Sequence, residues 1–303
     1  MIRRSVAAAV VVLGSLFALE SSALAFCRTT TVQKPASWSE VDLQQCFTDG
    51  KPLFWAGRCV GFSLNSSGSS HFPFDQIETT AKASFSAWSA VSCSSGAPSL
   101  QVSYLGPSTC GKVEFRGDAG NVNVVVFRDA SWPDDLDPQH VIALTTVQYN
   151  TTTGELRGFD MEINTAKQNI TIDGTGGSIA LPGVLTHEAG HVLGFAHSTD
   201  KLATMYERYS STIGTLTTDD IGAMCTVYPP DGTRPTGDGT KTALACDPTP
   251  PRGYVPDCTA DTKSGCSCAI VGAREERGGR SVAAPIVSVG LLFAFLRRRR
   301  RTP

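Results

Sequence analysis

Basic residues are scarce in the middle of this 303-residue chain. Seven of its 26 lysines and arginines lie at the two ends, as Arg3, Arg4 and the run 297–301. The 19 that remain face 28 acidic residues, so the middle of the protein carries a net charge of about −9 at neutral pH. Nucleic-acid binding needs a basic patch or stripe, and the sequence offers none. Nucleic acid is therefore excluded as a partner.

Long apolar runs are also lacking, and the first of the two short ones lies at the N-terminus. Residues 6–19 are apolar apart from one serine and one glycine, and they follow Arg3 and Arg4. The small residues Ala23 and Ala25 come next. A basic start, a short apolar stretch and small residues predict a secretory signal peptide at 1–25, removed after Ala25.

The second apolar run, residues 282–296, is followed directly by the five arginines of 297–301. Its fifteen residues are fewer than the ~20 that span a bilayer comfortably. Arginines next to an apolar segment favour the cytoplasmic side of a membrane, which leaves everything upstream on the far side. We interpret 281–303 as an anchor or sorting segment that contacts the membrane through the C-terminal tail.

Large apolar side chains become rare from about Pro229, where Pro, Gly, Thr and Asp predominate. Such a composition cannot build a core, so residues 231–280 are predicted to form a cysteine-containing stalk. The body, 26–230, has the length of one domain.

Cysteine is plentiful by contrast, which is typical of disulfides in an exported protein. Both regions hold an even number of cysteines, so each could close its own bridges, in connectivities that the sequence leaves open. Six lie in the body (Cys27, Cys46, Cys59, Cys93, Cys110, Cys225) and four in the tail (Cys246, Cys258, Cys266, Cys268).

The pattern of the body predicts an α+β domain, with strands first and helices at the flanks. Residues 74–91 place Ile77, Ala81, Phe85 and Trp88 on one helical face. A second helix starts near Pro182, and a third starts at Thr217, which forms a capping-box pattern with Asp220. Strands are predicted in four runs rich in β-branched and aromatic residues: 100–105, 121–127, 141–150 and 156–164.

Histidine is scarce, and three of the five histidines lie within 187–197. His187 and His191 would stand one above the other on a helix, so that both rings can reach one metal ion. Glu188 points about 100° away, where it can touch a water on the metal. Gly194 can take the left-handed conformation that ends a helix and returns the chain, which brings His197 to the same ion.

The spacing H-E-x-x-H-x-x-G-x-x-H is the metzincin zinc signature. The segment 187–209 resembles the active site of the matrixins, the matrix-metalloprotease branch of the metzincins, and the likeness extends over about 70–230. The resemblance implies a twisted mixed sheet with an active-site helix, a helix on its N-terminal side and a C-terminal helix. It also implies one catalytic Zn²⁺ bound by His187, His191 and His197, Glu188 as general base, and Met205 as the methionine-turn floor.

The same resemblance implies a substrate cleft. Ala143, Leu144 and Thr145 would form the strand edge that pairs with an extended substrate, and Tyr209 keeps the family pattern of the pocket wall. Glu207 stands where matrixins usually have proline, so the shape and specificity of the S1′ pocket are open.

Other features of matrixins are missing. Only His71 and His140 remain for the structural zinc of vertebrate members, which is too few. A cysteine switch is lacking, because Cys59 has none of the surrounding motif. Ca²⁺ sites are conceivable in the acidic loops 133–138 and 173–177, although such loops are usually solvated turns.

The tail resembles the MYXO-CTERM sorting tail of bacterial surface proteins, in Cys266, Cys268, the apolar run and the arginine block. Together these features predict an exported, monomeric zinc endopeptidase that acts on protein or peptide substrates at the cell surface, anchored by its tail or released after processing. A non-catalytic adhesion module on the same fold is the main alternative, and an intact Glu188 argues against it. A member of another metzincin branch is the third.

Overall fold

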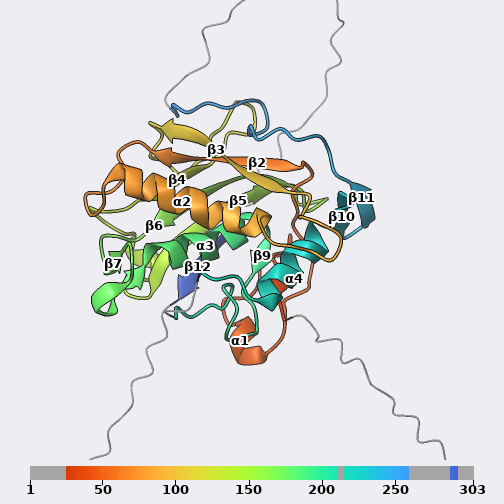
Figure 1. The fold of residues 1–303 in the computed structure, drawn as a ribbon, viewed down its shortest axis with the longest axis horizontal. Coiled ribbons are helices and arrows are strands. Elements are labelled where there is room, and N and C mark those ends of the chain that lie inside the picture. Colours follow the sequence, from red (N-terminus) through yellow and green to blue (C-terminus); the bar gives the residue numbers. More distant parts are fainter. Residues whose placement is uncertain (1–24, 211–213, 259–286, 293–303) are drawn as a thin grey trace, which may run out of the picture.

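The computed structural model describes residues 25–210, 214–258 and 287–292 and shows an α+β domain (Figure 1). Its helices are α1 (Glu40–Leu43), α2 (Phe74–Ser89), α3 (Leu181–Val192) and α4 (Thr218–Val227), with 3₁₀ turns at Asp134–Leu136 and Thr175–Gly177. The main strands are β2 (Cys59–Asn65), β3 (Gln101–Ser108), β4 (Val124–Phe127), β5 (Val141–Tyr149), β6 (Leu156–Ile163) and β12 (Val287–Leu292). Short strands are β1 (Cys27–Arg28), β7 (Ile170–Thr171), β8 (Ile179–Ala180), β9 (Phe195–Ala196), β10 (Thr233–Thr236) and β11 (Gly239–Thr242).

The six main strands form one mixed sheet in the order β12-β5-β6-β4-β2-β3. Neighbouring strands are parallel from β6 to β3, whereas β5 is antiparallel to both β6 and β12. Helices α2 and α3 lie side by side across one face of this sheet (Figure 1). The predicted fold class and mixed sheet are confirmed.

Helix α2 packs against both the sheet and its neighbour α3. Ile77, Ala81, Phe85 and Trp88 are each at most 1% exposed, as their spacing predicts. The Phe85 ring stacks on Phe62 of β2 with centroids 4.1 Å apart. One stripe of the helix thus packs against the sheet, and Trp88 at its end reaches α3.

Strand β2 was not predicted, although it lies in the interior of the sheet with all seven residues buried. Its sequence, CVGFSLN, mixes apolar residues with Gly, Ser and Asn. A strand buried on both faces lacks the alternation that marks a half-exposed one. Gly61 is required there, because a Cβ would lie 2.3 Å from the carbonyl oxygen of Pro248.

The region expected to be a stalk is attached to the domain as far as residue 258. Arg234 of β10 is fully buried, and its guanidinium donates to the carbonyl oxygens of Trp55 (2.9 Å) and Gly57 (3.0 Å). Tyr254 lies 2.8 Å from the hydroxyl of Ser63 on β2. The composition suggested a linker because it is poor in large apolar residues, but polar and covalent contacts hold this segment instead. Residues 259–280 lie outside the described part, so a stalk there stays a prediction.

Three disulfides join Cys27 to Cys46, Cys59 to Cys246 and Cys93 to Cys225. One bridge joins the body to the tail, because the segment after β11 runs along β2 and brings Cys246 to Cys59. Cys110 and Cys258 are free thiols that lie together in a small apolar cluster under β4.

Both predicted membrane-targeting segments fall mainly outside the described residues. The predicted signal peptide covers 1–25, of which only Ala25 is described. In the tail, residues 287–292 of the apolar run form strand β12 of the sheet, whereas Cys266, Cys268 and the arginines are not described. Within the described ranges, no helix is both long and apolar enough to cross a bilayer.

Replacing Cys59 and Cys246 together with serine should lower the free energy of unfolding by about 2–5 kcal/mol, because the bridge restricts a long loop of the unfolded chain. Urea unfolding of the oxidised protein measures this, with Thr240→Ser on the exposed strand β11 as the control. Free thiols at both positions in a non-reducing peptide digest would contradict the pairing.

Candidate metal centre

The histidines begin in the last two turns of α3, a helix with Pro182 in its first turn. His187 and His191 are at most 1% exposed, and their ring centroids are 4.8 Å apart. The end of α3 is well satisfied, because the Trp55 indole donates to the carbonyl of Val192 and the Tyr228 hydroxyl to that of Leu193. These two hydrogen bonds fix the C-terminal end of α3, which carries His187 and His191.

Gly194 turns the chain back towards α3. Its φ is +88°, and its N–H donates to the carbonyl oxygen of His191 at 3.0 Å. A Cβ at this position would lie 3.0 Å from the carbonyl oxygen of Leu53, so glycine is needed for conformation and for space. The chain then passes through β9 and places the His197 ring 5.4 Å from His187 and 5.0 Å from His191. The predicted left-handed turn is confirmed.

The protonation pattern of the rings suits a metal. The Nδ1 of His187 lies 2.6 Å from the carbonyl oxygen of Thr204, and the Nδ1 of His191 lies 2.8 Å from that of Phe195. A carbonyl only accepts, so each Nδ1 carries the proton and each Nε2 keeps a free lone pair. The Nε2 atoms of all three histidines are buried and have no hydrogen-bond partner among the described residues. One ring nitrogen from each lies within 4.8 Å of the others, so the three fit a zinc ion.

Burial keeps these imidazoles neutral. It lowers the pKa of His187 to about 4, against a smaller opposing effect of the Thr204 carbonyl. The pKa values of His191 and His197 fall well below the ordinary range, first through burial and then through the neighbouring histidines. Neutral rings at pH 7 are the form that binds metal.

Glu188 lies next to this cluster and is fully buried. Its Oε2 accepts a hydrogen bond from the Thr145 hydroxyl at 2.6 Å, whereas its Oε1 has no partner among the described residues. Burial raises the pKa of Glu188 to about 8, and the Thr145 bond opposes that rise. A carboxyl group with one oxygen held and the other free can exchange a proton with a molecule beside the histidines.

Met205 lies beneath the histidines against Gly190 of α3. A Cβ on Gly190 would come 2.2 Å from the Met205 sulfur, so glycine permits the close approach. Asp220 fixes the turn, because its carboxylate accepts from the backbone N–H groups of Thr204 (2.8 Å) and Met205 (3.2 Å). The same carboxylate closes the predicted capping box with Thr217 at the start of α4. This second role of Asp220 was missed, because a capping box by itself explains the residue.

The neighbouring Asp219 ties the beginning of the described chain to the site. Its Oδ1 accepts from the backbone N–H of Phe26 at 2.9 Å, and its Oδ2 accepts from the Ser198 hydroxyl at 2.7 Å. Ser198 directly follows His197. The segment that would begin the protein after signal-peptide removal is therefore anchored beside the third histidine.

The predicted cleft edge lies on β5. The edge consists of Ala143, Leu144 and Thr145, and Thr145 contacts Glu188 through its hydroxyl. The side of β5 that faces away from β6 pairs with β12. Ser288 lies opposite Thr146, Val289 opposite Thr145 and Gly290 opposite Leu144, in antiparallel register. In this structure a segment of the same chain thus occupies the edge that was predicted to pair with substrate. Tyr209 lies near the start of α3, where its hydroxyl accepts from the backbone N–H of Ala180 at 2.8 Å.

A second group of possible ligands adjoins the first and was not predicted. Glu40, His197 and Glu207 each place one ligand atom within 4.8 Å of the others, and all three are buried. In the sequence, Glu207 is notable only as a replacement for proline, and no motif marks Glu40 on the short helix α1 as functional.

The two remaining histidines and the acidic loops lie apart from these groups. The exposed ring of His140 pairs with Asp137 at 2.8 Å, and neither His140 nor His71 joins a metal-binding group among the described residues. Asp173 accepts hydrogen bonds from Thr171 and Thr175 within its own turn. Calcium in the acidic loops therefore stays a prediction.

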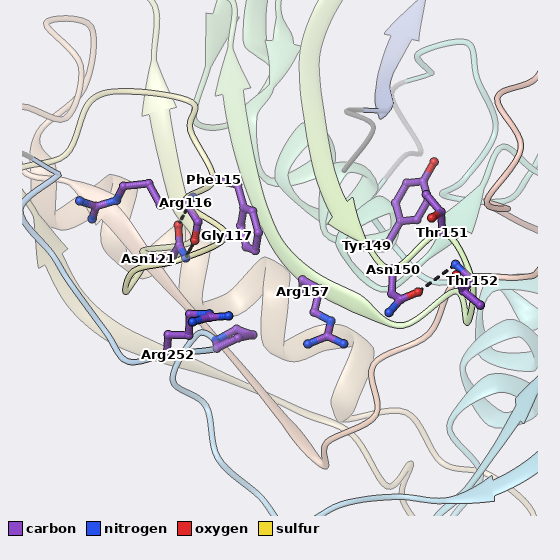
Figure 2. Close-up of a pocket in the computed structure, with 11 residues that line it drawn as sticks. Phe115, Arg116, Gly117, Asn121, Tyr149, Asn150, Thr151, Thr152, Arg157 and Arg252 are labelled. Atoms are coloured by element: carbon purple, nitrogen blue, oxygen red, sulfur yellow. Dashed lines mark hydrogen bonds between the residues drawn. The ribbon is translucent and has the colours of Figure 1, made fainter. Parts of the chain in front are cut away.

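A pocket of about 390 Å³ lies elsewhere, beyond the far end of β5 (Figure 2). Arginines and asparagines line it with Phe115 and Tyr149, and no histidine or carboxylate does. None of these lining side chains could take a proton from water at neutral pH, so the histidine cluster is the better candidate for a site of hydrolysis.

Three buried imidazoles from a helix and the turn after it, with a glutamate beside the first and a methionine beneath, define a zinc peptidase of the metzincin type. The mixed sheet with α2, α3 and α4 agrees with that class. A family model described as Matrixin matches residues 54–229, which is more than half of the chain. The protein belongs to the matrixins, a family of zinc metalloendopeptidases.

In the metal-free protein, the free energy of unfolding should depend on pH through the ionisation of Glu188. The stabilising effect of holding this proton is fully present below pH 4.5 and is lost as the pH rises through about 8, because the folded state keeps a proton that the unfolded chain releases. Glutamine cannot ionise. The free energy of unfolding of chelator-treated Glu188→Gln should therefore rise relative to the wild type between pH 5 and pH 8, by at most about 1.4 kcal/mol per unit of pKa shift.

Urea unfolding of both proteins at several pH values measures this difference. A difference that does not change with pH would show that Glu188 ionises at its ordinary value.

Proposed function

We propose that His187, His191 and His197 hold the catalytic zinc and that Glu188 is the general base of peptide hydrolysis. One observation carries the proposal: three buried imidazoles, whose Nε2 atoms have no partner among the described residues, converge beside a carboxyl group with one free oxygen. When bound, zinc lowers the pKa of a coordinated water towards ~7 and polarises the scissile carbonyl.

The residues of the chain supply the rest of the chemistry. Glu188 removes the proton from the attacking water through Oε1 and delivers it to the leaving amine. Thr145 holds Oε2, so the free oxygen keeps its direction. The backbone of β5 at Ala143, Leu144 and Thr145 pairs with the extended substrate, in the antiparallel manner in which it pairs with β12. A substrate would take the place of β12 on this edge.

Glu188→Ala should abolish peptidase activity while zinc stays bound at one ion per chain. The substitution removes proton transfer, worth about 10²–10⁴ in rate, but no metal ligand. Casein or gelatin zymography with and without chelator measures activity, and elemental analysis measures zinc.

Activity within about tenfold of the wild type would rule out this role, since general bases contribute more. Loss of zinc from the variant would mean that Glu188 helps to hold the metal. A wild type that binds zinc but cleaves nothing would favour the adhesion module.

We also propose that the enzyme is exported, begins near Phe26 and acts as a monomer on protein or peptide substrates at the cell surface. The apolar start, the disulfides and the arginine block after the second apolar run support export and anchoring. The backbone of Phe26 already contacts Asp219 beside the site, so removal of the first 25 residues would leave this contact in place.

Deletion of residues 266–303 should move the enzyme from the cell fraction to the medium without loss of disulfides. The reason is that the apolar run and its arginines are the proposed anchor. Cell fractionation with immunodetection measures the distribution, and replacement of the five arginines 297–301 by serine is the milder companion change. If the truncated protein divides between cells and medium as the full chain does, the tail is no anchor.

A further inference from the structure

The N-terminal loop, residues 27–46, packs against the side of the histidine cluster. The Cys27–Cys46 disulfide closes this loop. Its first strand, β1, pairs with β9, the strand that ends directly before His197. Helix α1 then begins after Ser39 and turns Glu40 into the interior. The loop is therefore fixed to the chain on which the third histidine lies.

Glu207 lies between the N-terminal loop and His197. Only 8% of the residue is exposed, and its Oε2 is 4.0 Å from the Nδ1 of His197. The Ser39 hydroxyl donates to its two oxygens at 3.2 Å each, and the Arg208 Nε lies 3.5 Å away. The carboxylate is thus held in place from two sides and directed at the ring.

Glu40 adds a second carboxylate to the same place. It is fully buried, its Oε2 pairs with Lys34 at 2.7 Å, and its Oε1 has no partner among the described residues. The Lys34 ammonium already supplies the cation that this carboxylate needs, which argues against a further metal ion between Glu40 and Glu207.

His197 differs from the other two histidines in what its Nδ1 meets. His187 and His191 donate to backbone carbonyls at 2.6 and 2.8 Å. The Nδ1 of His197 is buried without a hydrogen-bond partner among the described residues. A histidine that binds metal through Nε2 carries its proton on Nδ1 and normally donates it to a carbonyl or a carboxylate. The nearest charged acceptor here is Glu207.

We propose that Glu207 is the positioning residue of His197: its carboxylate accepts the Nδ1–H when the ring binds zinc, and Ser39 of the N-terminal loop keeps it in place. The inference rests on the proposed zinc site. A hydrogen bond requires an approach of about 1 Å from the present distance, which a small rotation of either side chain provides. The residue that replaces the usual proline thereby serves the metal, and docking of the N-terminal loop supports zinc retention.

The test is zinc affinity of the purified full chain, measured by competition with a chromophoric chelator. Glu207→Ala should weaken zinc binding by about 10- to 100-fold, as loss of such an outer partner does. Glu207→Gln has nearly the same shape and can still accept a bond from Ser39, so its smaller loss reports the charge alone. Asp238→Asn is the control, because Asp238 forms an exposed ion pair with Lys51 at 2.7 Å outside the N-terminal loop and should leave zinc affinity unchanged.

A second readout separates positioning from simple support of the fold. In the zinc-loaded protein, the imidazole Nδ1–H resonance of His197 should shift in Glu207→Gln, while those of His187 and His191 stay in place. Zinc affinity within about twofold of the wild type in both Glu207 variants, or an unshifted His197 resonance, would overturn the inference. A wild type that binds no zinc would instead overturn the zinc site itself, and the inference with it.

Discussion

The burial of three neutral imidazoles at one point is the constraint on which the rest of the structure depends. Removing His187, His191 and His197 from water leaves three Nε2 lone pairs without partners, which is costly unless an ion occupies the space between them. The surrounding groups therefore act to fix the rings. Backbone carbonyls orient two of them, and the turn at Gly194 sets the position of the third.

Contacts from several helices and strands support the histidine cluster. Helix α2 places Trp88 against α3, where its indole donates to the carbonyl of Thr186, one residue before the first histidine. Asp220 joins the start of α4 to the methionine turn, so the C-terminal helix holds Met205 below the rings. Thr145 connects strand β5 to Glu188. Each contact joins a different element to the same small volume, and together they limit movement of the rings.

Glu188 and Glu207, two of the carboxylates at the cluster, have different surroundings. Glu188 is fully buried with one free oxygen, and burial raises its pKa to about 8 without a bound metal, a value that a nearby cation would lower. Glu207 is held by Ser39 and Arg208 and faces the outer nitrogen of His197. Glu188 thus keeps one oxygen without a partner among the described residues, whereas both oxygens of Glu207 accept from Ser39.

The grouping of the three histidines and most of the local structure could be predicted from the sequence. Histidine spacing, Gly194, the stripe on α2 and the capping box of α4 are set by short-range geometry, so each could be predicted from residues a few positions apart. Strand β2 could not, because a fully buried strand has no alternation. The Cys59–Cys246 bridge, the burial of Arg234 and the placement of Glu40 beside His197 could not be predicted, because they depend on the tertiary structure. These contacts join residues 157 or more positions apart, and local sequence patterns carry no information about which distant segments meet.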